Sequence, residues 1–172
     1  MFKRLLSKIY TSFLKSHKTI YIAEDVRVDY RVEIESKDNI TIEKSSIIYK
    51  NVTLYKTKQA TFQMGEHSHI SSFTYMLLGD NNLTFGSNNA IAPFCAFYCT
   101  SNAISKEELF KDTYISADIV VGDNVFIGSH TVVLPGSIIE NNVVVASNSV
   151  VKGTLKSGYL YGGSPVKIVR EL

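Results

Sequence analysis

The sequence predicts an all-β fold, a parallel β-helix of hexapeptide repeats with a short N-terminal amphipathic helix and one extruded loop. Three observations lead to this prediction. Aliphatic residues recur at every sixth position through long stretches of the chain. The first eighteen residues instead repeat apolar side chains at spacings of three and four. One long polar segment interrupts the six-residue repeat.

The six-residue repeat is clearest in the C-terminal half. A helix would need a period near 3.6 residues and a simple amphipathic strand a period of 2, so neither explains it. In the C-terminal half the repeating positions are Val121, Ile127, Val133, Ile139, Val145 and Val151. The upstream positions in step with the repeat are Ile22, Val28, Ile34, Ile42, Ile48, Leu54, Met64, Ile70, Met76, Phe85, Ile91 and Phe97.

Each repeat predicts a short β segment with one inward side chain, and three segments make one triangular turn. Residues eighteen apart should then stack, which places Val121 under Ile139, while Phe85 lies below Val121 once the extruded loop is removed. Such a turn buries its inner face only by stacking on its neighbours. Gly and Asn suit the corners because they tolerate unusual backbone angles. Small bulges are expected at residues 55–63 and 79–84.

Composition fits one domain. The chain has 172 residues, 45% of them hydrophobic and 20% charged, which argues against disorder. A net charge of +2 is too small to indicate a nucleic-acid partner. Cys95 and Cys99 are expected to be free thiols in a reducing, cytoplasmic compartment. No second Cys or His pair stands at zinc-finger spacing beside these two cysteines, so no metal is expected.

Residues 1–18 form the predicted helix, ahead of a β-helix domain over residues 19–172. The helix carries five positive charges and no acid, on Lys3, Arg4, Lys8, Lys15 and Lys18. Its apolar stripe comprises Phe2, Leu5, Leu6, Ile9, Phe13 and Leu14. Charges interrupt that stripe too often for a membrane span or a signal peptide. Two interpretations stay open: the stripe packs on the domain or a neighbouring subunit, or it rests peripherally on anionic lipid at the inner membrane surface.

The extruded loop is expected at about residues 103–120. The polar and charged stretch SNAISKEELFKDTYISAD separates two regular parts of the repeat. Functional residues often lie on loops that a rigid scaffold positions, and long loops in compact domains are uncommon. The loop therefore predicts a functional site, and a tolerated insertion is the alternative.

Two motifs in the C-terminal half carry a resemblance to a known family. They read VVGDNVFIGSHTVVLPGSIIENNVVVASNSVVKG and GGSPVKIVREL. Over roughly residues 60–172 the chain resembles the hexapeptide acyltransferase superfamily, and in particular the galactoside, maltose and nodulation-factor O-acetyltransferases. The resemblance implies a left-handed β-helix and a homotrimer with three active sites, each between two subunits. It also implies acetyl-CoA as co-substrate.

By this resemblance acetyl-CoA lies along the outer groove of the C-terminal turns. Its pantetheine arm passes the corners at Ser129 and Ala146, and the Ser129 amide stabilises the oxyanion, a role that backbone N–H groups fill well. Basic side chains near the C-terminus suit the phosphates of CoA, although a solvated charged face is the alternative. The further positions matched to the cofactor are Phe126, Ser147, Lys152, Gly153, Pro165, Lys167 and Arg170.

The family's catalytic histidine falls on Asn102. The family pattern IAPNVxIYTxxHPID aligns with IAPFCAFYCTSNAIS, and the asparagine amide is not basic. Three explanations stay open. The chain is an inactive His-to-Asn form, which we favour because the CoA motifs are complete, or another base such as His67 or His69 serves, or the protein is a non-catalytic relative that binds CoA or a sugar. The alignment also places the acceptor near His69, Thr74, Tyr75 and Ser101.

The function predicted is acetyl-CoA-dependent O-acetylation of a sugar in a surface polysaccharide or glycolipid. Two alternatives are an N-acetyltransferase that acts on a nucleotide amino sugar and a non-catalytic CoA- or sugar-binding relative. A γ-type carbonic anhydrase shares the helix but needs three metal-binding histidines on adjacent turns. The spacing of His67, His69 and His130 does not fit that requirement.

Overall fold

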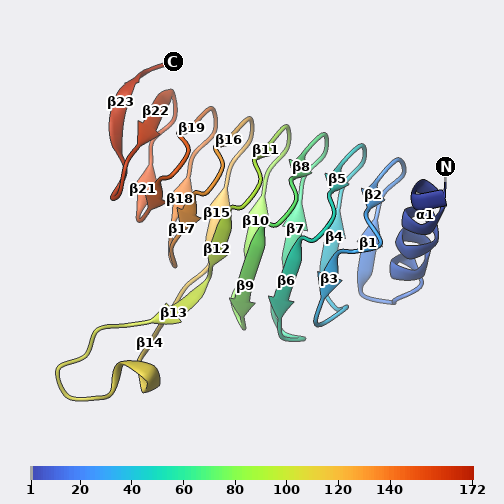
Figure 1. Cartoon of the computed structure of the whole chain (residues 1–172), viewed down its shortest axis with the longest axis horizontal. Helices are drawn as coiled ribbons and strands as arrows, with labels where there is room; N and C mark the ends of the chain where they lie inside the picture. The colour runs from blue at the N-terminus through green and yellow to red at the C-terminus, as the bar shows by residue number, and fades with distance from the viewer. Residues whose placement is uncertain (1) are drawn as a thin grey trace.

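Three sheets of stacked parallel strands form the body of the protein in the computed structural model, which describes residues 2–172 (Figure 1). The chain passes through the sheets in rotation, which gives a β-solenoid of about six turns. The first sheet contains β1 (Ile20–Ile22), β4 (Ile40–Ile42), β7 (Phe62–Met64), β10 (Leu83–Phe85), β15 (Ile119–Val121), β18 (Ile138–Ile139) and β21 (Thr154–Leu155). The predicted parallel β-helix is confirmed, and its left-handed winding stays a prediction.

The other two sheets complete each turn. The second contains β2 (Arg27–Val28), β5 (Ile47–Ile48), β8 (His69–Ile70), β11 (Ala90–Ile91), β16 (Phe126–Ile127), β19 (Val144–Val145), β22 (Tyr159–Gly162) and β23 (Lys167–Glu171). The third contains β3 (Glu33–Ile34), β6 (Thr53–Lys56), β9 (Tyr75–Gly79), β12 (Ala96–Tyr98), β17 (Val132–Val133) and β20 (Val150–Val151). Only β23 runs antiparallel to its neighbour within these three sheets, where it folds back on β22.

The inward columns follow the six-residue spacing. Val121 pairs with Phe85 on one side and with Ile139 on the other, as predicted. Every inward position that the spacing predicts is buried. Their aliphatic and aromatic side chains fill the prism, and burial of this apolar surface supplies the main stabilisation of a solenoid.

Turn lengths vary because the corners differ in size. Val121 and Ile139 are eighteen residues apart, but the stacked pair Ile42 and Met64 is twenty-two apart. The extra residues lie partly at the expected bulge, where the register shifts between Tyr55 and Lys56. The Lys56 ammonium is buried there and donates to the carbonyl oxygens of Asp38 and Thr57, at 2.8 and 2.7 Å.

Helix α1 (Phe2–Lys15) covers the first turn and ends three residues before the predicted boundary (Figure 1). Its buried residues are Ser7, Thr11 and Leu14. The backbone N–H of Val28 donates to Thr11 Oγ1 at 3.1 Å, so the helix satisfies a polar group at the open end of the solenoid. Of the apolar stripe, Leu14 packs on the domain and Leu6 is half-buried, whereas the other four side chains face away. Within residues 2–172 no helix is long and apolar enough to cross a bilayer.

The extruded segment is a β-hairpin that projects from the body (Figure 1). Strands β13 (Thr100–Asn102) and β14 (Tyr114–Ser116) pair antiparallel, and a 3-10 turn η1 (Phe110–Asp112) lies between them. The predicted range 103–120 needs correction at both ends. The hairpin already begins at Thr100, because buried Cys99 is the last residue before it, and the chain rejoins the first sheet at Ile119.

Candidate active site at the Ser129 corner and the hairpin

The corner between β16 and β17 presents a free backbone donor. Gly128 precedes it, and its N–H donates to the carbonyl of Val145 at 2.8 Å. A Cβ on Gly128 would lie 2.6 Å from the Ser147 nitrogen, so only glycine lets these two turns stack so closely. The next amide, that of Ser129, donates to no acceptor among residues 2–172. It therefore remains available to a ligand.

The following turn repeats this arrangement. The Ala146 N–H donates to the carbonyl of Tyr161 at 2.8 Å, and the Ser147 N–H has no acceptor within the described part of the chain. The two free amides belong to adjacent turns, and adjacent strands lie about 4.8 Å apart. The corner thus offers a short row of donors, which suits an extended ligand that carries its own amide and carbonyl groups.

Several of the predicted cofactor residues surround this row. Phe126 is exposed on β16, the strand that leads directly into the corner. Strand β23 places Lys167 opposite Gly162 and Arg170 opposite Leu160, both exposed. The turn that contains Pro165 is tied to β20, since the Val166 N–H donates to the Val150 carbonyl at 3.0 Å. The C-terminal strand therefore brings two cations to the last turn beside the corner.

Lys152 and Gly153 lie elsewhere. Both follow β20, so they occupy the corner at the opposite end of the third sheet from Ser147, which precedes it. Lys152 is exposed, and Gly153 adopts a left-handed φ of 82°. The structure of one chain does not bring these two residues to the Ser129 corner.

Asn102 lies on strand β13 of the hairpin, opposite Tyr114. Its side-chain Nδ2 donates to the carbonyl oxygen of Phe110 at 2.9 Å, which ties the strand to η1. The hairpin leaves the body after the end of β12, whereas Ser129 lies before the start of β17, the parallel neighbour of β12. In one chain the two candidate catalytic positions therefore lie at opposite ends of the third sheet.

The four predicted acceptor residues do not form one group. His69 lies on the second sheet, edge-on to Tyr49 with ring centroids 6.2 Å apart, and burial lowers its pKa below the ordinary histidine value. Tyr75 lies on the third sheet, and Ser101 is in the hairpin opposite Ile115. Ser101 is next to Asn102 in the hairpin, whereas Tyr75 begins its strand at the end of the third sheet where the Ser129 corner lies.

Thr74 was predicted to contact the acceptor, and this prediction is wrong. The residue is only 1% exposed, because it belongs to an inner corner of the solenoid. Its hydroxyl has no hydrogen-bond partner among residues 2–172. A buried hydroxyl without a partner carries a desolvation penalty that the fold must offset.

We expect Thr74→Val to stabilise the protein by about 1 kcal/mol, because valine keeps the shape and removes the unpaired hydroxyl. Chemical denaturation of the purified protein measures the change. Thr131→Val is the matched control: this buried Thr131 Oγ1 donates to the Ala146 carbonyl at 3.3 Å, so the same substitution should destabilise. A loss of stability at both positions would contradict the expectation.

Sequence reasoning missed two aromatic columns. On the third sheet the rings of Tyr55, Tyr75 and Tyr98 follow one another with centroids 5.7 and 6.0 Å apart. At the Ser129 corner the His130 ring stacks on Phe94, with ring centroids 5.0 Å apart. The repeated appearance of Tyr directly beside an inward position could have indicated the first column, but the rings meet at diagonal positions, which a fixed period does not show.

Metal ligands do not gather in the part of the chain that the structure describes: no three His, Cys, Asp or Glu side chains are placed to hold an ion. Cys95 and Cys99 are both buried and unpaired with one another. Burial raises the pKa of the Cys99 thiol to about 12 and also raises the pKa of Cys95. Both thiols are therefore poor nucleophiles at neutral pH.

Comparison with known proteins agrees with this architecture. Residues 118–153 match the bacterial transferase hexapeptide (six repeats) family. Galactoside O-acetyltransferase of Escherichia coli is 27% identical over 145 residues, which cover 81% of this chain and 70% of that enzyme. A putative lipopolysaccharide biosynthesis O-acetyl transferase of the same organism is 31% identical over 111 residues, 63% of this chain and 57% of that protein.

A solved structure extends the likeness to the fold. A mutant of AntD, an N-acyltransferase from Bacillus cereus in complex with dTDP and coenzyme A, superposes with a TM-score of 0.83 at 20% identity. The match covers 94% of this chain and 88% of that one. Residues 118–153 therefore belong to the bacterial transferase hexapeptide family, and the whole solenoid is similar to hexapeptide-repeat acyltransferases.

Proposed function

We propose that this protein binds acetyl-CoA at the Ser129 corner and transfers the acetyl group to a sugar hydroxyl of a surface polysaccharide or glycolipid. The row of free amides at Ser129 and Ser147 is the observation that carries the proposal. The amide of Ser129 stabilises the negative charge that develops on the thioester oxygen, and Lys167 and Arg170 hold phosphate groups. The resemblance of the C-terminal motifs to CoA-dependent enzymes supports this assignment.

The reaction needs a base at the acceptor hydroxyl. The base takes the hydroxyl proton, the oxygen attacks the thioester carbonyl, and the CoA thiolate leaves and is protonated. Asn102 cannot take that proton. We therefore propose that the chain with Asn102 is a slow form of an enzyme that uses histidine at this position.

The proposal requires a homotrimer. Asn102 and Ser129 lie at opposite ends of the third sheet in one chain, so a site that contains both must combine two chains. Threefold assembly, in which the hairpin of one subunit reaches the Ser129 corner of the next, supplies three such sites. Size-exclusion chromatography with light scattering tests the assembly directly, and a monomer at assay concentration contradicts it.

N-acetylation of an amino sugar is the second candidate, and Asn102 itself favours it. An unprotonated amine attacks a thioester without prior removal of a proton, so it depends less on a base than a hydroxyl does. Relatives named for O-acetyl and for N-acyl transfer both resemble this chain. The two candidates share the cofactor corner and differ only in the acceptor.

An acceptor panel separates these candidates. We expect the purified protein to bind CoA and to release free CoA from acetyl-CoA slowly with one class of sugar. Matched pairs, each a hydroxyl sugar and its amino analogue, identify the acceptor atom by mass spectrometry of the product. Failure of CoA to bind in calorimetry would contradict the proposed function whatever the acceptor.

A further inference from the structure

Helix α1 sits on the solenoid in an unusual orientation. Its buried face is polar: Thr11 Oγ1 donates to the Ser7 carbonyl at 2.8 Å and accepts from the Val28 N–H at 3.1 Å. Leu14 is the one large apolar side chain of the helix that is fully buried. An amphipathic helix on a globular protein normally turns its apolar stripe to the core. Here most of the stripe, apart from Leu14 and the half-buried Leu6, is left outside.

The outward face is strongly apolar. Phe2, Leu5, Ile9 and Phe13 are 72%, 54%, 58% and 51% exposed. Their spacing of three and four residues places them on one face of the helix. Four large apolar side chains in one exposed row are not scattered surface residues, and such rows mark contact sites.

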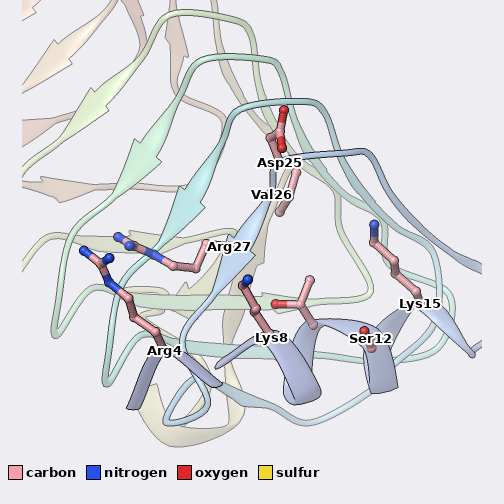
Figure 2. A pocket seen from close by; sticks show the side chains of 8 residues that line it. Arg4, Lys8, Ser12, Lys15, Asp25, Val26 and Arg27 are labelled. Carbon is pink, nitrogen blue, oxygen red and sulfur yellow. The ribbon is translucent and has the colours of Figure 1, made fainter. Parts of the chain in front are cut away.

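A basic groove runs along the side of this helix. Its volume is about 560 Å³, and its lining includes Arg4, Lys8 and Lys15 of α1 and Arg27 of β2. Figure 2 shows the side chains of Arg4 and Lys8 rising from the helix on the side where Arg27 leaves its strand. Asp25 is the one acid in the lining against these four cations. The Arg27 guanidinium also lies over the Tyr49 ring, 5.6 Å from its centroid.

The charge and the apolar surface around α1 together indicate which kind of partner binds here. Cations that share a groove repel one another, and an anion between them relieves this repulsion. An apolar helix face with a flanking basic row is the pattern of helices that lie in the membrane interface. A two-fold contact with a second copy through this face fits less well, because it would bring the same cations together twice.

We propose that α1 docks the protein on the surface of an anionic phospholipid bilayer. Phe2, Leu5, Ile9 and Phe13 enter the boundary between headgroups and acyl chains. The groove lined by Arg4, Lys8 and Arg27 holds headgroup phosphate. The contact needs neither the Ser129 corner nor Asn102, so it stands or falls independently of the proposed acetyl transfer.

Vesicle co-sedimentation of the full chain tests the proposal. We expect binding to phosphatidylcholine vesicles that contain phosphatidylglycerol, little binding to phosphatidylcholine alone, and weaker binding as salt rises. Each cation near an anionic surface contributes about fivefold to the partition, so Arg4→Gln with Lys8→Gln should weaken binding about twenty-five-fold. The same charge change at exposed Lys50 and Lys58, remote from α1 in sequence, is the matched control and should have little effect.

A second pair of variants tests the apolar face. Ile9→Ser with Phe13→Ser should abolish sedimentation, whereas Ile104→Ser with Leu109→Ser, which are even more exposed on the hairpin, should not. Circular dichroism and unfolding curves verify that the variants fold. Equal binding to neutral and anionic vesicles, or binding unchanged by the α1 variants, overturns the proposal. So does a loss of subunit assembly in the Ile9 and Phe13 variant when the parent protein ignores vesicles, because the stripe would then be a subunit contact.

Discussion

Asn102→His should raise the rate of acetyl transfer to a hydroxyl acceptor by about a hundredfold or more, because a positioned general base contributes on that order. The hairpin already provides a hydrogen-bond acceptor that would orient a histidine side chain at position 102. Asn102 Nδ2 donates to the Phe110 carbonyl at 2.9 Å, and the Nδ1–H of a histidine at the same position would make the same bond. That bond fixes the tautomer and leaves Nε2 as the proton acceptor.

The rate is measured as free CoA released from acetyl-CoA, read with a thiol reagent. The protein itself contributes little background, since Cys95 and Cys99 are buried and the pKa of Cys99 is about 12. The rate should fall as the pH drops through the ordinary histidine range near 6.5, where the base becomes protonated. Asn102→Ala is the control, because it loses the bond to Phe110 without gaining a base. A histidine variant no faster than the alanine variant, with CoA binding intact, would falsify the assignment of this position.

Ser129→Pro, introduced together with Asn102→His, should lower kcat by about a hundredfold to a thousandfold, as expected for the loss of one oxyanion donor. Proline removes the N–H and little else at this corner. Pro93 already occupies the same place one turn earlier, where the His130 N–H donates to its carbonyl at 3.3 Å. The residues that follow, Phe94 and His130, both have a φ of 60°. The backbone at Ser129 therefore accommodates proline.

Two measurements separate chemistry from structure for this variant. Ser129→Ala keeps the backbone amide and should stay near the parent in kcat. Thermal unfolding should show that the proline variant remains folded. If the alanine variant lost as much activity as the proline variant, the hydroxyl rather than the amide would be the functional group.

The inward columns were predictable because each of their residues must be buried by the turn above and below. Any aliphatic residue at the right six-residue step can be buried in this way, and its burial does not depend on the length of the corners. The outward columns were not predictable. Tyr55 and Tyr75 are twenty residues apart, and Tyr75 and Tyr98 are twenty-three apart, because the rings meet diagonally: the register partners of Tyr75 are Thr53 and Ala96. A fixed period therefore finds the core but not which surface side chains meet.

The candidate site likewise contains residues that were predictable from the repeat and residues that were not. The Ser129 corner belongs to the regular part of the repeat, and its free amide follows from the corner geometry. Thr74 was misplaced because alignment gives position along the chain and not the direction of the side chain. Polar contacts hold α1 in its orientation, among them the bond from the Val28 N–H to Thr11 and the bond from the Tyr10 hydroxyl to the Val32 carbonyl, and helical periodicity alone cannot show that a polar face will be the buried one.

The first and last elements, α1 and β23, also prevent strands of another molecule from adding to the ends of the solenoid. A stack of parallel strands exposes unpaired backbone donors and acceptors at each end, and another molecule could continue the stack there. Helix α1 blocks this at the first turn, and β23 blocks it at the second sheet of the last turn by running backwards along β22. A chain shortened by its first fifteen residues should therefore tend towards end-to-end fibres rather than towards simple unfolding.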